Sequence, residues 1–148
     1  MSLRHLYQEM IIDHGKQPRH FGALAQANHI HAGHNPLCGD KLTIYVLEDN
    51  GVVTDLRFEG SGCAISVASA SLMTETIKGK TLAEVEAIFS GFHHLVTEGK
   101  EPTTAIGKLA IFAGVAEFPM RVKCATLSWH TLMAALKHDP NPVSTESE

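Results

Sequence analysis

The chain has 148 residues, of which 44% are hydrophobic and 19% are charged, a composition typical of one ordinary globular domain. Twelve basic residues scattered among sixteen acidic ones give a formal charge of -4, which argues against a nucleic-acid partner because no basic stripe can form. No apolar run reaches the roughly eighteen residues of a membrane span, and the segment 1–10 lacks the features of a signal peptide. We therefore expect a cytoplasmic protein without a membrane partner.

Apolar residues near the N-terminus recur at spacings of three and four, which predicts an amphipathic helix over residues 3–14 with Gly15 as its C-cap. The next segment, 16–36, is rich in Pro, Gly, Asn and His, and it predicts a loop with one strand around 28–32. We expect this loop to lead directly into Cys38.

Two runs of alternating apolar residues predict strands over 41–48 and 52–58. Asn50-Gly51 between these runs is a strong sequence signal for a β-hairpin. The apolar spacing then becomes helical until Gly79, so we expect Cys63 at the start of a helix.

Further helices are expected in the C-terminal half of the chain. A capping-box pattern that begins at Thr81 opens one helix, which we expect Gly91 to interrupt. A second helix is predicted over 104–118 and closed by Pro119, and the last helix is predicted over 124–137.

A hairpin followed by helices predicts an α+β fold. We expect a small three-stranded antiparallel sheet with the helices packed on one side of it. Residues 1–139 are interpreted as a single domain, and the polar segment 140–148 is interpreted as a flexible tail.

The chain has three cysteines, an odd number that would leave one thiol over in a disulfide framework, so we expect free thiols. Cys38 lies between Pro36 and Gly39, which permit a tight turn, and Asp40 is close enough along the chain to share a metal with its thiolate. Cys63 is expected at a helix N-terminus, where unpaired amides favour a thiolate.

Cys124 is expected at a second helix start, directly after the cations Arg121 and Lys123, which also favour an ionised sulfur. Three thiolates and one carboxylate are four donors that a tetrahedral zinc site accepts. The spacing alone leaves this interpretation open, because a single cysteine is more often a small buried hydrophobic residue and Asp40 alone is typical of a turn. No cysteine pair at CxxC spacing favours the metal.

Several short motifs then follow one another in a characteristic order. They are Leu6–Glu9, Ile12–His14 and Pro18–Gly22 near the N-terminus, and the three cysteine motifs Pro36–Asp40, Gly60–Ser66 and Arg121–Cys124. Together they resemble the motifs of the IscU/NifU-like iron-sulfur cluster assembly family, in which an Asn commonly stands at the place of His20. The resemblance covers almost the whole chain up to the tail.

Two features distinguish the subfamilies. The segment between Cys63 and Cys124 is longer than in IscU by roughly one helix, and Lys123 precedes the third cysteine where IscU carries a His. Both features resemble SufU. The resemblance implies the IscU/SufE-like fold.

The resemblance also implies an activity, that of a zinc-dependent, sulfurtransferase-type sulfur carrier of the SUF system. Zn²⁺ would be held by Cys38, Asp40, Cys63 and Cys124, and Cys38 would accept persulfide sulfur from a SufS-like, PLP-dependent cysteine desulfurase. Arg121 would help the two proteins engage. A SufBCD-type assembly complex would receive the sulfur.

Two other interpretations use the same four groups. One is a scaffold on which iron or a transient [2Fe-2S] cluster is assembled, and the other is a purely structural metal with the function elsewhere in the chain. A zinc-loaded protein without colour favours sulfur transfer, and a brown protein that passes its cluster to an apo-ferredoxin favours the scaffold.

The chain has ten histidines, more than the site requires. His29, His31 and His34 alternate in a way that could suggest an extra metal site, although solvated loop histidines are the more common interpretation. His130 is interpreted as a surface or partly packed residue, because the site already has four candidate ligands.

Overall fold

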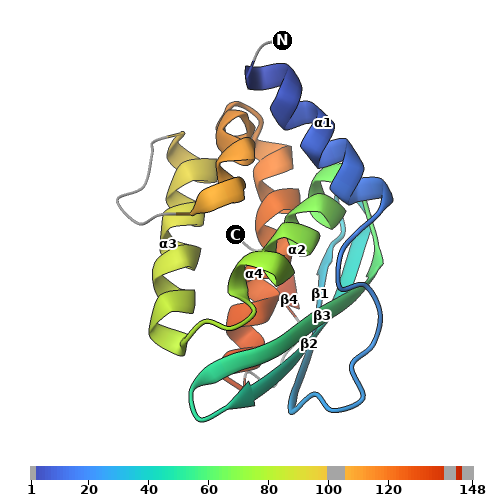
Figure 1. Ribbon diagram of the computed structural model, residues 1–148. Coiled ribbons are helices and arrows are strands. Elements are labelled where there is room, and N and C mark those ends of the chain that lie inside the picture. The colour runs from blue at the N-terminus through green and yellow to red at the C-terminus, as the bar shows by residue number, and fades with distance from the viewer. Residues whose placement is uncertain (1–2, 100–105, 139–142, 145–148) are drawn as a thin grey trace.

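The structure is a computed structural model that describes residues 3–99, 106–138 and 143–144. Figure 1 shows its elements, which comprise helices, one 3₁₀ helix and short strands. In chain order they are α1 (Leu3–Lys16), β1 (His29–Asn35), β2 (Asp40–Asp49), β3 (Val52–Ser61), α2 (Ala64–Ile77), α3 (Leu82–Glu98), the 3₁₀ helix η1 (Gly107–Glu117), α4 (Pro119–Leu136) and β4 (Val143–Ser144). In the described part of the chain, no helix is long and apolar enough to cross a membrane.

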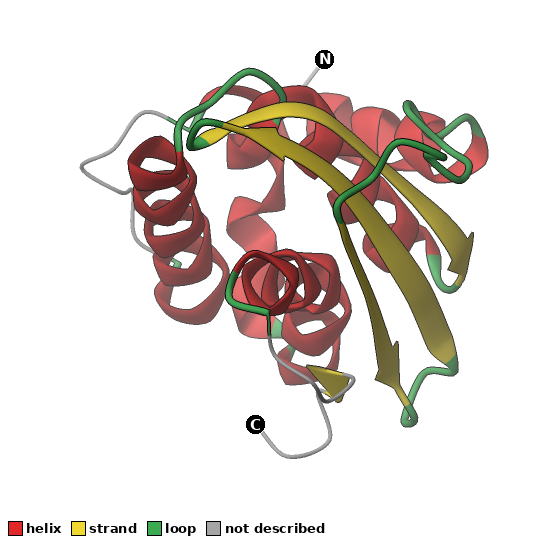
Figure 2. Ribbon diagram, turned by 90° about the horizontal axis from the view of Figure 1, so that it is seen from below, coloured by secondary structure: helices red, strands yellow, loops and turns green. Residues whose placement is uncertain are grey.

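The strands form one sheet in the order β3-β2-β1-β4, and the helices pack on one side of it (Figure 2). The pairs β1·β2 and β2·β3 are antiparallel, as predicted, so the α+β fold is confirmed. The sheet has a fourth strand that was not predicted, since β4 pairs in parallel with Gly33 and His34 of β1. Its two residues lie in the segment 140–148, and the rest of that segment is outside the described residues.

The turns of the two hairpins lie at opposite ends of the sheet and have different roles. At one end, Asn50 and Gly51 have φ angles of 52° and 79°, and two successive positive φ angles are those of the type I′ turn that the sequence signals. At the other end, Asn35 pairs with Asp40, so the turn between β1 and β2 carries Cys38. The candidate ligands Cys38 and Asp40 therefore share this end of the sheet.

Helix α2 lies against both the sheet and other helices, and its side chains are almost all buried. Its serines are small enough to let neighbouring helices approach closely, and their hydroxyl groups form hydrogen bonds with those helices. Ser69 Oγ donates to the carbonyl of Ala125 at 2.5 Å and accepts from Nε1 of Trp129 at 3.1 Å. The Trp129 ring stacks on Phe92, with centroids 4.8 Å apart, and both rings are fully buried.

Three predicted helix boundaries are wrong, namely those at Gly15 and Gly91 and the start of the last helix. Gly15 lies inside α1, and a β carbon there would be 3.3 Å from Cβ of Ala64, so the small residue allows a close contact with the start of α2. Gly91 is buried within a continuous α3, whose capping box at Thr81 is confirmed. The predicted helix end before Pro119 is observed, since η1 ends at Glu117. Pro119 also begins α4, five residues before the predicted start of the last helix, because proline fits the first helical turn.

The predicted helix over 104–118 is observed as the 3₁₀ helix η1 from Gly107, and residues 104 and 105 are outside the described part of the chain.

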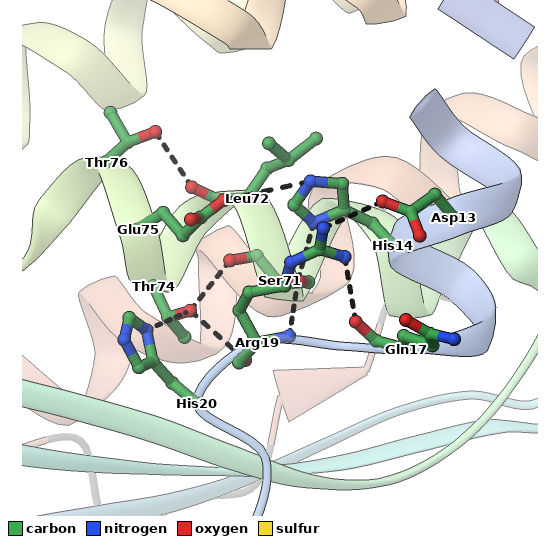
Figure 3. A network of polar contacts seen from close by, with 10 residues as sticks. All are labelled: Asp13, His14, Gln17, Arg19, His20, Ser71, Leu72, Thr74, Glu75 and Thr76. Carbon is green, nitrogen blue, oxygen red and sulfur yellow. Dashed lines mark hydrogen bonds and ion pairs between the residues drawn. The ribbon is translucent and has the colours of Figure 1, made fainter. Parts of the chain in front are cut away.

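A polar network ties α1 and the loop after it to α2 (Figure 3). Nδ1 of His14 is 2.7 Å from Oγ of Ser71, and the same oxygen accepts from the backbone amide of Arg19 at 2.8 Å. Nδ1 of His20 is 3.0 Å from Oγ1 of Thr74. These contacts hold the N-terminal segment against the helix that begins at the candidate centre.

The environment of His14 lowers the pKa of its imidazole below the ordinary value near 6.5. Burial is the main cause, because the residue is only 3% exposed, and the nearby cation of Arg19 adds to it. The carboxylate of Glu75, 3.7 Å from Nε2, acts in the opposite direction but does not reverse the shift. The folded protein therefore binds this proton less readily than the unfolded chain does.

This shift predicts how stability depends on pH. The free energy of unfolding should be greatest above about pH 6.5 and should fall as the pH drops through the lowered pKa of His14. His14→Gln should weaken this dependence, measured by urea unfolding between about pH 5 and pH 8. His5→Gln, an exposed histidine of the same helix, is the control and should follow the wild type. Equal slopes for His14→Gln and wild type would contradict the assignment.

Candidate metal centre

The turn between β1 and β2 presents Cys38 to solvent. The amides of Cys38 and Gly39 both donate to the carbonyl of Asn35, at 3.3 and 2.8 Å. Gly39 has a φ of +73°, a value that glycine adopts at little cost, so the turn closes as the sequence predicts. The thiol of Cys38 is exposed.

Asp40, the first residue of β2, is fully buried rather than an exposed turn residue. Its Oδ1 accepts from the amide of Cys63 at 2.9 Å, whereas Oδ2 has no hydrogen-bond partner among the described residues. Gly62 leaves the necessary room, because a β carbon there would lie 2.5 Å from Oδ1. A buried carboxylate oxygen without a partner is costly, and a bound cation would satisfy it.

Cys63 is the N-cap of α2, as predicted, and its Sγ accepts from the amide of Ser66 at 3.5 Å. A hydrogen bond from the Cys124 thiol is the main cause that lowers the pKa of Cys63, to about 7, and the Ser66 amide contributes against the opposing effect of burial. A substantial fraction of this thiol is therefore ionised at neutral pH, which suits a metal ligand.

Cys124 is buried inside α4, five residues after Pro119, so the prediction that it lies at a helix start is wrong. The hydrogen bond to Cys63, followed by burial, raises the pKa of Cys124, which makes it the proton donor of the pair. Its Sγ is 3.3 Å from Sγ of Cys38. A buried thiol next to two others is neutral without a metal, and a divalent cation would displace its proton.

Three of the four predicted ligands meet at one end of the sheet, although they come from distant parts of the chain: ligand atoms of Cys38, Asp40 and Cys124 all lie within 4.8 Å of one another. The sulfur of Cys63 is outside this group, but its amide donates to Asp40 and its thiol interacts with that of Cys124. Three sulfurs and one carboxylate are a donor set that zinc accepts, and thiolates also hold iron-sulfur clusters. The unpartnered oxygen of Asp40 shows that this donor set fits a cation.

Arg121 is not part of this cluster. It lies in the first turns of α4, where its guanidinium carbon is 4.5 Å from the centre of the Phe118 ring. Both residues line an open groove of about 870 Å³ together with Tyr7 of α1 and Ile65 of α2. Since Ile65 is two residues from Cys63, this groove begins beside the candidate centre.

Asn35 is a site residue that the sequence interpretation missed. It is fully buried, its Nδ2 is 3.7 Å from Sγ of Cys124, and its Oδ1 accepts from the amide of Leu37 at 3.3 Å. An Asn that precedes a turn and bonds the amide two residues on is a known local motif, so the signal was present in the sequence. It could not show the contact with Cys124, which is 89 residues away.

The interpretation of His29, His31 and His34 as solvated loop residues is wrong. All three lie in β1, where His29 and His31 are buried and His34 faces solvent. His130 is half-buried between the rings of Phe89 and His93, with centroid distances of 5.4 and 5.7 Å, in agreement with a partly packed residue.

The sequence of this chain is similar to those of known proteins. The NifU-like N terminal domain family matches residues 6–125. A zinc-dependent sulfurtransferase SufU from Bacillus subtilis is 41% identical over 88% of this chain and 89% of its own length. An iron-sulfur cluster assembly scaffold protein IscU from Streptococcus pyogenes is 39% identical over 95% of this chain and 88% of its own length.

Solved structures agree with the sequence comparisons. The crystal structure described as an iron-sulfur cluster assembly scaffold protein for the SUF system of Fervidobacterium islandicum superposes with a TM-score of 0.83 at 36% identity. The match covers 91% of this chain and 99% of that one. The chain therefore belongs to the NifU-like N-terminal domain family and is a SufU-type member of the IscU/NifU-like iron-sulfur cluster assembly proteins.

Proposed function

We propose that this protein is a zinc-dependent sulfur acceptor that takes persulfide sulfur from a SufS-like cysteine desulfurase. The observation that carries the proposal is the pairing of one exposed thiol, Cys38, with a buried thiol, Cys124, at an Sγ–Sγ distance of 3.3 Å. The relative from Bacillus subtilis named as a zinc-dependent sulfurtransferase supports it.

Cys38, Asp40, Cys63 and Cys124 would hold the zinc. When bound, the metal keeps the thiolates deprotonated and protects them from oxidation at neutral pH. The protein provides the rest: Asp40 is fixed by the amide of Cys63, and the turn from Asn35 holds Cys38 at the surface.

Sulfur transfer needs one thiolate that a partner can reach. The Cys38 thiolate attacks the outer sulfur of the desulfurase persulfide, a new S–S bond forms on Cys38, and the S–S bond of the donor breaks. The donor cysteine leaves as a thiolate and takes up a proton from solvent. No oxidant or reductant is consumed, because the sulfane sulfur moves from one cysteine to another.

Docking of the desulfurase would use the groove beside the centre. Phe118 is 41% exposed although it is large and apolar, and it carries the guanidinium of Arg121 over its ring. An aromatic residue with an arginine is typical of the residues that contribute most to protein interfaces. We therefore assign Arg121 to partner binding, in the cytoplasm, with a SufBCD-type complex as the later sulfur acceptor.

Asn35 has a supporting role in this proposal. Its Nδ2 is placed to donate to Cys124, while its carbonyl holds the amides that shape the Cys38 turn. One buried residue thus holds the Cys38 turn through its backbone carbonyl and approaches Cys124 through its side chain, as residues around metal ligands commonly do.

Replacement of Cys38 tests its role as the acceptor. Cys38→Ser should reduce stimulation of cysteine turnover to the rate of the desulfurase alone, because a hydroxyl cannot hold the sulfane sulfur. The measurement is alanine or sulfide release with and without this protein. Thr54→Ser, at the far end of the sheet from Cys38, is the control and should stimulate like wild type. Wild-type stimulation by Cys38→Ser would refute the assignment.

Asn35→Asp tests the supporting contact. The new carboxylate preserves the acceptor for the Leu37 amide but replaces the donor to Cys124 by a negative charge. We expect zinc affinity to fall about 10- to 100-fold, measured by competition with a chelator. Unchanged affinity in a variant that folds normally by circular dichroism would show that the contact has no influence on the metal.

Air-free purification separates the proposal from a cluster scaffold, an activity for which several relatives are named. We expect a colourless protein with stoichiometric zinc that loses stimulation of the desulfurase after chelation and regains it with zinc. A brown protein that transfers its cluster to an apo-ferredoxin would favour the scaffold instead. Chelation that unfolds the domain, with full activity in the cysteine variants, would identify a purely structural metal.

A further inference from the structure

Two histidines and a glutamate, His29, His138 and Glu48, lie together at the opposite end of β1 from the cysteines. His29 begins the strand and is only 9% exposed. Its Nε2 is 3.0 Å from Oε1 of Glu48 on the neighbouring strand β2. A histidine held by a carboxylate in this way has a fixed ring and a more basic second nitrogen, which is the usual arrangement behind a metal-bound imidazole.

The second ring nitrogen of His29, Nδ1, is in an unusual environment. Nδ1 is buried and has no hydrogen-bond partner among the described residues. When Nε2 donates to Glu48, Nδ1 carries a lone pair, so the buried atom is an acceptor that needs a donor or a cation. Buried polar atoms are nearly always paired, and this exception requires an explanation.

His138 provides a second imidazole at the same place. Its ring centre is 4.5 Å from that of His29, and the two planes are inclined by 43°. The residue follows Lys137, the C-cap of α4, and has a φ of +56°, a conformation that His and Asn adopt more readily than most residues. The C-terminal end of an α-helix carries partial negative charge, which favours a cation there.

This group is separate from the cysteine centre. His29 and Asn35 are six residue steps apart along an extended strand, which corresponds to about 20 Å. Along α4, fourteen residues separate Cys124 from His138, a rise of about 21 Å if the helical spacing is applied throughout. The two estimates agree, so a metal at His29 cannot share ligands with the cysteines.

We propose that His29 and His138 bind a divalent transition-metal ion of the zinc, cobalt and nickel class, with Glu48 as the residue that orients His29. Two imidazole nitrogens suit these borderline ions, and water would complete the coordination because His138 is open to solvent. The ion would join the C-terminal end of α4 to β1 and stabilise the fold by binding only the folded state. The inference is independent of the proposed sulfur transfer.

The test is a Co²⁺ titration of the full chain after its cysteine centre has been loaded with zinc. Bound Co²⁺ should give weak visible bands without the strong near-ultraviolet sulfur-to-cobalt absorption that thiolate ligands cause, and it should raise the melting temperature. His138→Asn should weaken this binding by at least about tenfold, and Glu48→Gln should weaken it by about 10- to 100-fold. Asn is compatible with the positive φ, so the variant should fold.

His34→Asn is the matched control, since His34 lies on the same strand but faces solvent on the other side of the sheet. It should bind Co²⁺ like wild type. The proposal is wrong if the zinc-loaded protein binds no further Co²⁺, if His138→Asn binds it as tightly as wild type, or if the spectrum shows thiolate ligands. In the first two cases the contact between the two rings is packing alone, and sulfur transfer through Cys38 is unaffected.

Discussion

The buried carboxylate of Asp40 is the constraint on which the candidate centre depends. A carboxylate withdrawn from water must be hydrogen-bonded or paired with a cation. Oδ1 of Asp40 accepts a hydrogen bond from the amide of Cys63. That bond joins the first residue of β2 to the N-cap of α2, and it forms because Gly62 leaves space beside the oxygen. The second oxygen has no partner in the described fold, so a metal would complete an existing arrangement.

Close packing places the remaining sulfur. Ser69 of α2 bonds the carbonyl of Ala125, the residue after Cys124, and therefore sets the position of α4 against α2. Gly33 allows β1 to approach α4, because a β carbon there would be 2.1 Å from Oγ1 of Thr131. Because the residues at these contacts are small, Cys124 in the middle of α4 lies close to the turn between β1 and β2. The sulfur of Cys124 is thus buried beneath Cys38 by the same packing that forms the core.

Local signals predicted the parts of the fold that local chemistry decides. The Asn50-Gly51 turn, the capping box at Thr81 and the N-cap position of Cys63 were all recognisable, because each depends on a few neighbouring residues. The helix end before Pro119 was predicted, but the start of α4 at Pro119 was missed, because proline both ends and begins helices and its neighbours do not show when it does both. The strand β4 and the contact of Asn35 with Cys124 depend on residues far apart in the chain. Spacing alone could not have shown that the cysteines meet, whereas the ordered motifs indicated it.

The three thiols differ in environment, and this difference bears on which of them would accept sulfur in the proposed transfer. Cys63 is half-buried at a helix N-terminus, and its lowered pKa favours the thiolate form that a metal would bind. Cys124 is buried within α4, so no partner protein can reach its sulfur without moving the helix. Only Cys38 combines exposure with contact to another sulfur, and it lies on a turn whose movement leaves the paired strands intact. A nucleophile must meet the donor sulfur in line with the breaking bond, and for this reason the proposed sulfur transfer assigns the acceptor role to the thiol on the turn.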